Sequence, residues 1–317
     1  MEKGEMEKNV LCFTDEPMLT VSGILDKKLE GQSDIVFEVL NPDLCSGSYA
    51  GREVTLNGRV YLYRSLRSWL DLAANLHCRM LTPKIATEQT ILLHFQKLET
   101  HSFHQEKPAE RSEKYGTGSG FAAINKNEEP AFLTAYTHAL DVAEVKTRTR
   151  VLNLGVNRGD EFALIQELLP KESFEAIEFV GIDHSESAIQ EAGSRFNTPN
   201  MHFYSHDIND LDALKLGTFD LIISIGTLQS PGINYKPFLM ELVQNHLSRE
   251  GAIILGFPNS RWIDGEMLYG AKMRNYRESD LSLLLGDIDY AKRYLQQKKF
   301  SVRISGKEYI FLTAVSL

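Results

Sequence analysis

The sequence predicts an α/β fold: a doubly wound, mostly parallel, seven-stranded sheet that ends in an antiparallel hairpin, preceded by a small N-terminal α+β module. From residue 150 onward, short apolar runs recur every 15 to 35 residues with helix-like segments between them. Several runs are apolar at consecutive positions, as in parallel strands that are buried on both faces and joined by crossover helices. The last two runs meet at Gly306, which predicts the antiparallel pair.

Composition supports a globular chain. The 317 residues are 43% apolar and 24% charged, with a net charge of −9 and a pI near 5.6. This acidity argues against a protein that works mainly by coating phosphate backbones. Three scattered cysteines (Cys12, Cys45 and Cys78) predict neither a zinc site nor a disulfide framework. The N-terminus lacks an apolar signal region, and no apolar run approaches a membrane span, so we expect a cytoplasmic location.

Residues 1–110 are expected to form the N-terminal module. The run at 34–40 is typical of a strand, and Asn57-Gly58 lies between two alternating runs in 52–63, which predicts a hairpin. Residues 65–76 predict an amphipathic helix. Its expected buried face consists of Leu66, Trp69, Leu70, Ala73 and Leu76. HCRMLTP and QTILLHFQKL, which follow, are expected to be two further strands.

Residues 99–130 are polar and rich in glycine and proline, as expected of a connector, and PAFLTAYTHALDVAEV predicts the helix that follows. We place the second domain at 111–317, with 111–149 as its leading segment and helix. The predicted strands of its sheet are RVLNLG, FVGID, HFYSHD, FDLIISIG and AIILGF, then FSVRIS and YIFLTAV after a helix that ends in YAKRYLQQKKF.

Polar residues and glycines follow three of these strands. Gly155 to Gly159 forms a turn before a helix that begins near Asp160, where backbone amides can approach a ligand. The second strand ends in Asp183, whose carboxylate can accept hydrogen bonds from a ribose diol, and the third ends in Asp207. Together these strand ends predict a nucleoside-binding cleft.

A dinucleotide site is the alternative. The Gly-x-Gly-x-x-Gly fingerprint is met at one glycine of three, because Asn157 and Asp160 occupy the second and third positions. A carboxylate beside a diphosphate would also repel it. We therefore expect a ligand without a diphosphate at this turn.

The order of these motifs resembles a class I S-adenosylmethionine-dependent methyltransferase. VLNLGVNRG is similar to the first motif of that family, FVGIDHS to the second, HDI to the third and FDLIISIGTLQS to the fourth strand. LMELVQNHLSREGAIILGF is similar to the helix, turn and fifth strand. The resemblance covers residues 150–317 and implies S-adenosylmethionine as the cofactor, with no metal.

The resemblance implies a set of cofactor-binding residues from the turn and the strand ends. It assigns Gly155, Asn157 and Gly159 to the methionine part, Asp183 to the ribose, and Asp207 and Ile208 to the adenine. His184, beside the ribose acid, Ser224 and Gly226 complete the expected cofactor-binding set. Two positions depart from the family. Asn153 replaces an acid, for which Asp160 is a possible substitute, and Asn157 replaces a glycine. These departures motivate a second hypothesis, a non-catalytic cofactor-binding regulator.

Acceptor binding is expected from two loops. Tyr115 begins a Gly/Ser-rich stretch that family members often fold over the cofactor, although an ordinary linker would have the same composition. After the fifth strand, Arg261 could clamp an anion, Trp262 could stack on a ring, and Asp264 or Glu266 could take a proton. The alternative is that Trp262 covers the sheet edge and the charges are solvated.

The resulting function is methyl transfer to an unidentified acceptor, which we expect to be a small metabolite. RNA is the second choice, because residues 52–84 carry six basic and two acidic residues. No membrane partner is expected, and the N-terminal module is a possible surface for homo-oligomers.

Overall fold

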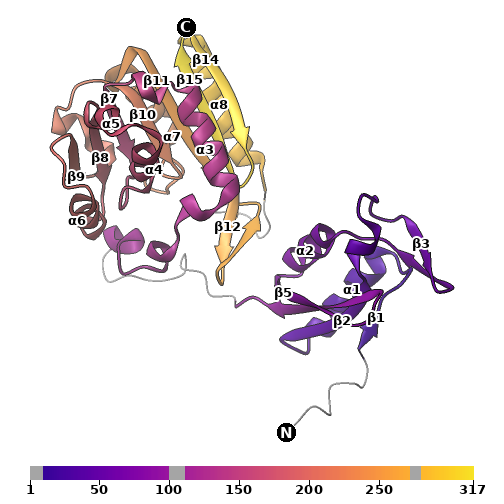
Figure 1. Cartoon of the computed structure of the whole chain (residues 1–317). Helices are drawn as coiled ribbons and strands as arrows, with labels where there is room; N and C mark the ends of the chain where they lie inside the picture. The colour runs from indigo at the N-terminus through magenta and orange to yellow at the C-terminus, as the bar shows by residue number, and fades with distance from the viewer. Residues whose placement is uncertain (1–9, 100–110, 272–279) are drawn as a thin grey trace. The chain divides into compact units, whose positions relative to one another are not determined.

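The computed structural model describes residues 10–99, 111–271 and 280–317 (Figure 1). The chain divides into two compact units. The first contains Met1–His101 and Trp262–Leu268, and the second contains Ser102–Arg261 and Tyr269–Leu317. The domain boundary expected after residue 110, like part of the connector, falls in 100–110, which lies outside the described residues.

The first unit contains a four-stranded sheet in the order β1-β2-β6-β5 and a separate hairpin, β3-β4. In chain order its elements are β1 (Leu11–Cys12), α1 (Met18–Leu29), β2 (Asp34–Leu40), η1 (Pro42–Cys45), β3 (Glu53–Leu56), β4 (Arg59–Leu62), α2 (Leu66–Asn75), β5 (Cys78–Ile85) and β6 (Thr90–Lys97). The predicted hairpin is confirmed: Asn57 and Gly58 have φ of 50° and 76°, as a type I′ turn requires.

The core of this unit is built on Phe37, whose ring centre lies 4.9 Å from that of Phe95 and 5.8 Å from that of Trp69. Helix α2 buries Trp69 and Ala73, as predicted, together with Leu72. Leu66 and Leu70 are each 42% exposed, so that part of the predicted face is wrong. The sheet covers only the stripe that Trp69, Leu72 and Ala73 occupy, which is narrower than the apolar pattern in the sequence.

The second unit has the predicted seven-stranded sheet, in the order β14-β15-β11-β10-β7-β8-β9. Strands β11 to β9 are parallel, and β15 and β14 add an antiparallel hairpin at one edge. The strands are β7 (Arg150–Leu154), β8 (Glu178–Asp183), β9 (Met201–Ser205), β10 (Phe219–Ile225), β11 (Leu247–Pro258), β14 (Phe300–Gly306) and β15 (Tyr309–Ser316). A further hairpin, β12 (Ser260–Ile263) and β13 (Glu266–Tyr269), follows β11.

Helices cover both faces of this sheet, because alternate residues of its parallel strands are apolar on opposite sides. The helices are α3 (Pro130–Val142), α4 (Asp160–Leu168), α5 (Lys171–Glu175), α6 (Glu186–Arg195), α7 (Tyr235–Glu241) and α8 (Ser282–Gln297). Short helical turns are η3 (Arg111–Tyr115), η4 (Gly120–Ala123), η5 (Lys126–Glu128), η6 (Val145–Thr147), η7 (Ile208–Leu214) and the π-helical η8 (Leu242–His246). One core joins α3, α4 and α5 to Val151 of β7, and the other joins α7 and α8 to Leu152 and Leu154. These strands are therefore buried on both sides.

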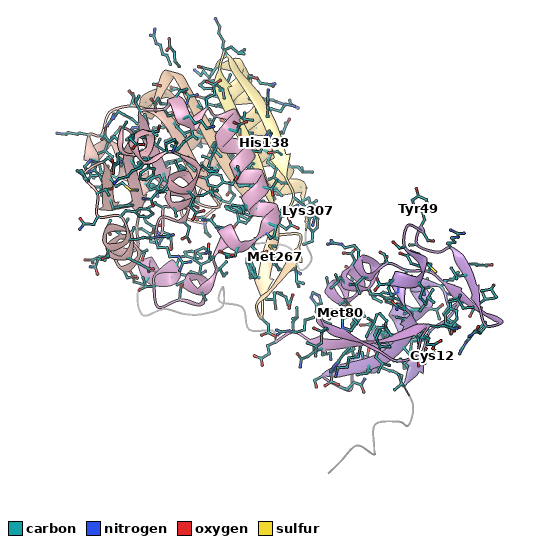
Figure 2. All side chains as sticks on the ribbon, in the orientation of Figure 1. Cys12, Tyr49, Met80, His138, Met267 and Lys307 are labelled. Atoms are coloured by element: carbon teal, nitrogen blue, oxygen red, sulfur yellow. The ribbon has the colours of Figure 1, made fainter. Side chains whose placement is uncertain are left out.

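The three cysteines are free thiols and all lie in the first unit, where Cys12 is labelled in Figure 2. Among the described helices, none combines the length and the apolar character that a membrane crossing requires.

Candidate active site

The candidate site lies where the strand order reverses. Strand β7 is flanked by β8 on one side and by β10 on the other, so the connections that leave β7 and β10 diverge at their carboxyl ends. In an open α/β sheet, this divergence opens the crevice where ligands bind. The glycine turn after β7, Asp183 at the end of β8 and Gly226 after β10 all stand at this edge.

The turn after β7 requires left-handed backbone at three positions. Gly155, Asn157 and Gly159 have φ of 75°, 46° and 85°. A Cβ on Gly155 would lie 2.0 Å from Thr227 Oγ1, so only glycine fits there. Asn157 is tolerated because asparagine adopts left-handed geometry more readily than other non-glycine residues. The predicted glycine-rich turn therefore keeps its shape despite the asparagine.

Asp183 is the buried acid of the site, with 6% of its surface exposed. Its Oδ2 accepts a hydrogen bond from the backbone N–H of Asn157 at 3.0 Å, and its Oδ1 accepts one from the N–H of Ser185, also at 3.0 Å. His184 is half exposed, and its Nδ1 lies 3.4 Å from the same Oδ1. The carboxylate is thus fixed in orientation by the glycine turn and by the start of α6.

The segment that begins at Tyr115 folds over the turn and α6. Asn157 Nδ2 donates to the carbonyl oxygen of Tyr115 at 2.7 Å, and Thr117 N donates to Ser187 Oγ at 3.1 Å. The carboxylate of Glu113 accepts hydrogen bonds from Ser187 and Ser185, and these bonds lower the pKa of Glu113. We call residues 113–124 the cover segment.

Arg158 ties the far end of the cover segment to α4. Its Nη1 donates to the carbonyl of Ala122 at 2.8 Å, its Nη2 donates to that of Ile124 at 3.2 Å, and its Nε pairs with Asp160 at 3.0 Å. Asp160 also pairs with Arg195 at 2.6 Å. Two arginines therefore neutralise Asp160, which makes it a poor substitute for the acid that Asn153 replaces.

The buried acid nearest to Asn153 is Glu161 in α4. Asn153 Nδ2 lies 3.4 Å from Glu161 Oε2, and burial raises the pKa of Glu161 to about 7, against the lowering effect of Lys126. Within the described part of the chain, Asn153 Oδ1 is buried without a hydrogen-bond partner. Sequence analysis missed Glu161, although an acidic first turn after the glycine turn was a visible signal.

Aromatic rings surround the ammonium of Lys126 in the same region. Its Nζ lies 4.9 Å from the ring centre of Tyr309 and 5.4 Å from that of Phe121, and the Phe121 ring packs edge-on against Tyr115 at 5.3 Å. The Tyr309 hydroxyl also borders Gly226, because a Cβ built there would lie 3.8 Å from it. Neither Lys126 nor Tyr309 carried a sequence signal, since each comes from a distant segment.

Other predicted cofactor residues have structural partners. Ser224 is buried and its Oγ donates to the carbonyl of Leu154 at 3.3 Å, which joins β10 to β7. Ile208 packs in the core, whereas Asp207 is exposed and its Oδ1 accepts from Asn209 N at 2.9 Å, at the start of η7. Their contacts with a cofactor remain predictions.

The predicted acceptor loop is divided between the units. Arg261 belongs to the second unit with Asp183 and Tyr115, and its Nη1 donates to the carbonyl of Gly270 at 2.7 Å, while burial lowers its pKa. Trp262 and Glu266 belong to the first unit. The loop is a hairpin, β12-β13, and its Asp264-Gly265 turn is the same type of signal that predicted the Asn57-Gly58 hairpin.

Residues 146–302 match the family model described as a methyltransferase domain, whereas a search of curated proteins finds no match. Among solved structures, the chain is similar to the plantazolicin methyltransferase BpumL in complex with SAH (18% identity, 62% of this chain and 89% of that chain, TM-score 0.46). It is also similar to a magnesium protoporphyrin IX methyltransferase from Synechocystis PCC 6803 with bound SAM (18% identity, 64% and 88%, TM-score 0.39).

The matched region begins just before β7, contains the glycine turn and Asp183, and ends in β14. It therefore includes the parallel strands of the sheet and the turn whose motifs indicated the family. Residues 146–302, which supply most of the second unit, therefore match a methyltransferase domain.

Proposed function

We propose that the second unit binds S-adenosylmethionine around Asp183 and transfers its methyl group to a nucleophile of a small-molecule acceptor. The observation that carries this proposal is the environment of the Asp183 carboxylate. A carboxylate can accept about four hydrogen bonds, and the two backbone donors at 3.0 Å use one position on each oxygen. One further position on each oxygen suits the two neighbouring hydroxyls of a ribose.

Glu161 and Lys126 suit the amino-acid end of the cofactor. The charges of Glu161 and Lys126 are near enough that each shifts the pKa of the other. The α-ammonium of the cofactor could pair with the carboxylate of Glu161 and donate a hydrogen bond to the unpartnered Asn153 Oδ1. Its α-carboxylate could pair with the ammonium of Lys126. We infer that the acidic role of the residue that Asn153 replaces has moved to Glu161.

S-adenosylmethionine supplies an electrophilic methyl group on a sulfonium, so the chain itself has to position the acceptor and exclude water. Water exclusion is a role for the cover segment, which Asn157 and Arg158 hold against the glycine turn and α4. Tyr309 borders Gly226, and Tyr115 packs against Phe121 in the cover segment, so these rings could contact an acceptor. Of the predicted acceptor residues, Arg261 belongs to the second unit and is retained in this proposal, whereas the roles of Trp262 and Glu266 remain predictions.

The arginines of the first unit favour a small acceptor over RNA, because some of them are already paired within the protein. Arg64 is 6% exposed, donates to the carbonyl of Glu16 and lies 5.4 Å from the ring of Trp69. Arg67 pairs with Asp71 at 3.1 Å. Two of the arginines that raised the RNA hypothesis thus already have partners, which reduces the charge available for phosphates.

The regulator hypothesis depended on Asn153 and Asn157. Asn157 keeps the left-handed turn, and its side chain adds a hydrogen bond to the cover segment. Asn153 has an acid beside it in Glu161. Both departures from the family are thus accommodated at the site, which favours turnover over a purely regulatory role.

Calorimetric titration with S-adenosylmethionine tests the proposal. We expect the wild-type protein to bind it and not NAD, and we expect Asp183→Asn to lose about 1.5 to 3 kcal/mol of binding free energy, the value of hydrogen bonds to a charged acceptor. The control is Asp141→Asn, which removes an exposed carboxylate from α3 and should bind as the wild type does. Unchanged binding by Asp183→Asn would overturn the proposed site.

A further inference from the structure

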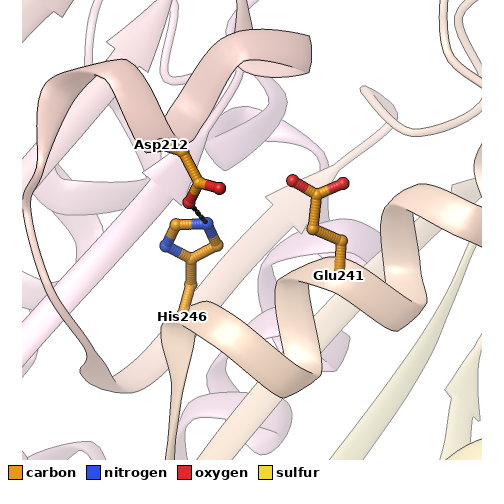
Figure 3. Close-up of side chains that lie close together, drawn as sticks. All are labelled: Asp212, Glu241 and His246. Atoms are coloured by element: carbon orange, nitrogen blue, oxygen red, sulfur yellow. Dashed lines mark ion pairs between the residues drawn. The ribbon is translucent and has the colours of Figure 1, made fainter.

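A second group of ligand-type side chains lies away from the active site. Asp212 in η7, Glu241 at the end of α7 and His246 at the end of η8 lie close together, and Figure 3 shows the imidazole of His246 facing the carboxylate of Asp212. One ligand atom from each of the three residues lies within 4.8 Å of the other two. Asp212 and Glu241 are exposed, whereas His246 is 7% exposed.

The imidazole of His246 is directed at this point. Its Nε2 lies 3.1 Å from Asp212 Oδ1, but it is buried without a properly aligned hydrogen bond to any described residue. A buried ring nitrogen without a hydrogen bond is costly. A ligand between the imidazole and the two carboxylates would satisfy this nitrogen. A cluster of carboxylates alone has no unsatisfied nitrogen and would not need a ligand.

The backbone explains how Glu241 and His246 come to face each other. In an α-helix, residues five apart point about 140° away from each other, because each residue turns the helix by about 100°. The turn from Leu242 to His246 is π-helical, and its wider winding returns residue i+5 to the side of residue i. The π-turn thus places both side chains on one side, next to Asp212.

We propose that Asp212, Glu241 and His246 form a binding site for a divalent transition-metal ion of the zinc class. Bonds of about 2.0 to 2.2 Å in a tetrahedral site place ligand atoms roughly 3.3 to 3.6 Å apart. The 3.1 Å separation of His246 and Asp212 is close to this value, and the exposed Glu241 has to move inward by little more than about 1 Å. One imidazole with two carboxylates favours Zn²⁺, Co²⁺ or Ni²⁺ over Mg²⁺.

This metal site is separate from the methyl-transfer site. His246 directly precedes β11, and Leu247 pairs with Phe219, the first residue of β10. The site therefore lies at the amino edge of the parallel strands, whereas Asp183 lies at the carboxyl end of β8. The ion would join η7 to the turn between α7 and β11, so its role would be to stabilise the fold of the second unit.

Titration of the full chain, without an affinity tag and after treatment with a chelator, tests the proposal. We expect one equivalent of Zn²⁺ to bind, Co²⁺ to give the visible absorption of a tetrahedral site, and Mg²⁺ to bind at least tenfold more weakly. Glu241→Gln and His246→Gln should each weaken Zn²⁺ binding at least tenfold. Glu191→Gln, which changes an exposed residue of α6, should bind Zn²⁺ as the wild type does.

Glu241→Gln is the decisive variant. An ordinary ion pair between Asp212 and His246 does not need Glu241, so unchanged Zn²⁺ binding by this variant would overturn the metal site. Because Glu241 is exposed, the variant should fold even if His246→Gln does not. Its affinity for S-adenosylmethionine should stay unchanged, so that the metal site and the proposed function can fail separately.

Discussion

At the scale of single residues, Glu161 has the most unusual environment of the site. It is 8% exposed, and desolvation raises its pKa from 4.5 to about 7 despite the nearby ammonium of Lys126. A carboxyl group with only a structural role at this position would destabilise the fold at neutral pH, because burial disfavours its charged form. A charged ligand beside it would remove part of that penalty, which is consistent with a binding role.

This environment predicts how stability depends on pH. A carboxyl group whose pKa is higher in the folded than in the unfolded state destabilises the fold as pH rises from about 4.5 through 7. Glu161→Gln lacks this titration. We therefore expect the variant to gain about 2 kcal/mol of unfolding free energy relative to the wild type between pH 5 and pH 8, measured by urea unfolding with circular dichroism.

Glu167→Gln is the control for this prediction, because Glu167 is an exposed residue of the same helix. It should show no gain between the two pH values. A wild type that becomes more stable than Glu161→Gln as pH rises would contradict the raised pKa of Glu161.

Sequence patterns could predict the residues that follow one another in the turn and at the strand ends. Gly155, Gly159 and Asp183 lie within or next to buried strands, so local motifs determine their positions. Lys126 and Tyr309 could not be found in this way. They lie 183 residues apart in the sequence and meet only because η5 and β15 pack near the same strand ends.

At the scale of elements, the cover segment is held by backbone carbonyl groups. Asn157 and Arg158 bond to the carbonyls of Tyr115, Ala122 and Ile124, so these bonds do not depend on which side chains the cover segment carries. Such a segment can change its sequence to suit an acceptor while it keeps its attachment to the glycine turn and α4.

The bond from Asn157 can be tested with a glycine. Asn157→Gly keeps the left-handed backbone but removes the hydrogen bond to Tyr115, which contributes about 1 kcal/mol. We expect amide hydrogen exchange in residues 115–124 to be roughly fivefold faster, because local opening becomes that much easier. Mass spectrometry of the exchanged peptides measures this effect.

Asn57→Gly is a matched control, since Asn57 also has a positive φ but lies in the hairpin of the first unit. Its exchange in residues 115–124 should equal that of the wild type. Equal exchange in Asn157→Gly would mean that the hydrogen bond to Tyr115 does not hold the cover segment.

Two elements were missed in the sequence for different reasons. Helix α1 buries Val21, Leu25 and Leu29, a clear helical spacing, but Gly23 and three β-branched residues in 18–24 weaken its helix propensity. The β12-β13 hairpin carried a turn signal in Asp264-Gly265, but its polar and aromatic residues were interpreted as an open loop. Tertiary packing overrides local propensity in α1, whereas in the hairpin the local turn signal agrees with the structure.

At the scale of the whole molecule, the two units have separate hydrophobic cores, of which the first is built on Phe37 and the second on the two faces of the large sheet. The parallel orientation of the strands in that sheet could be predicted, because the connections between them are long enough for crossover helices. Two features could not be predicted, because both depend on contacts between distant segments. These are the parallel pairing of β1 with β2 and the inclusion of Trp262–Leu268 in the first unit.

The distribution of tryptophan allows the units to be followed separately. Both tryptophans of the chain, Trp69 and Trp262, lie in the first unit. A ligand that binds only the folded second unit, at a hundredfold excess over its Kd, should stabilise that unit by about 2.7 kcal/mol. We therefore expect S-adenosylmethionine to shift the unfolding transition seen by circular dichroism and to leave the tryptophan fluorescence transition unchanged.

The control is NAD, which should shift neither the transition seen by circular dichroism nor the tryptophan fluorescence transition. If S-adenosylmethionine shifts the fluorescence transition as much as the transition seen by circular dichroism, the two units unfold together and the prediction fails. A shift in fluorescence alone would place the ligand on the first unit, against the proposed site at Asp183.

The location of the three free thiols has a chemical consequence. Cys12, Cys45 and Cys78 all belong to the first unit, so the second unit, which we propose binds a reactive methyl donor, contains no sulfur nucleophile of the cysteine type. Self-alkylation of a cysteine near the donor is thereby avoided. Reagents that alkylate thiols would therefore modify the first unit and find no cysteine in the second.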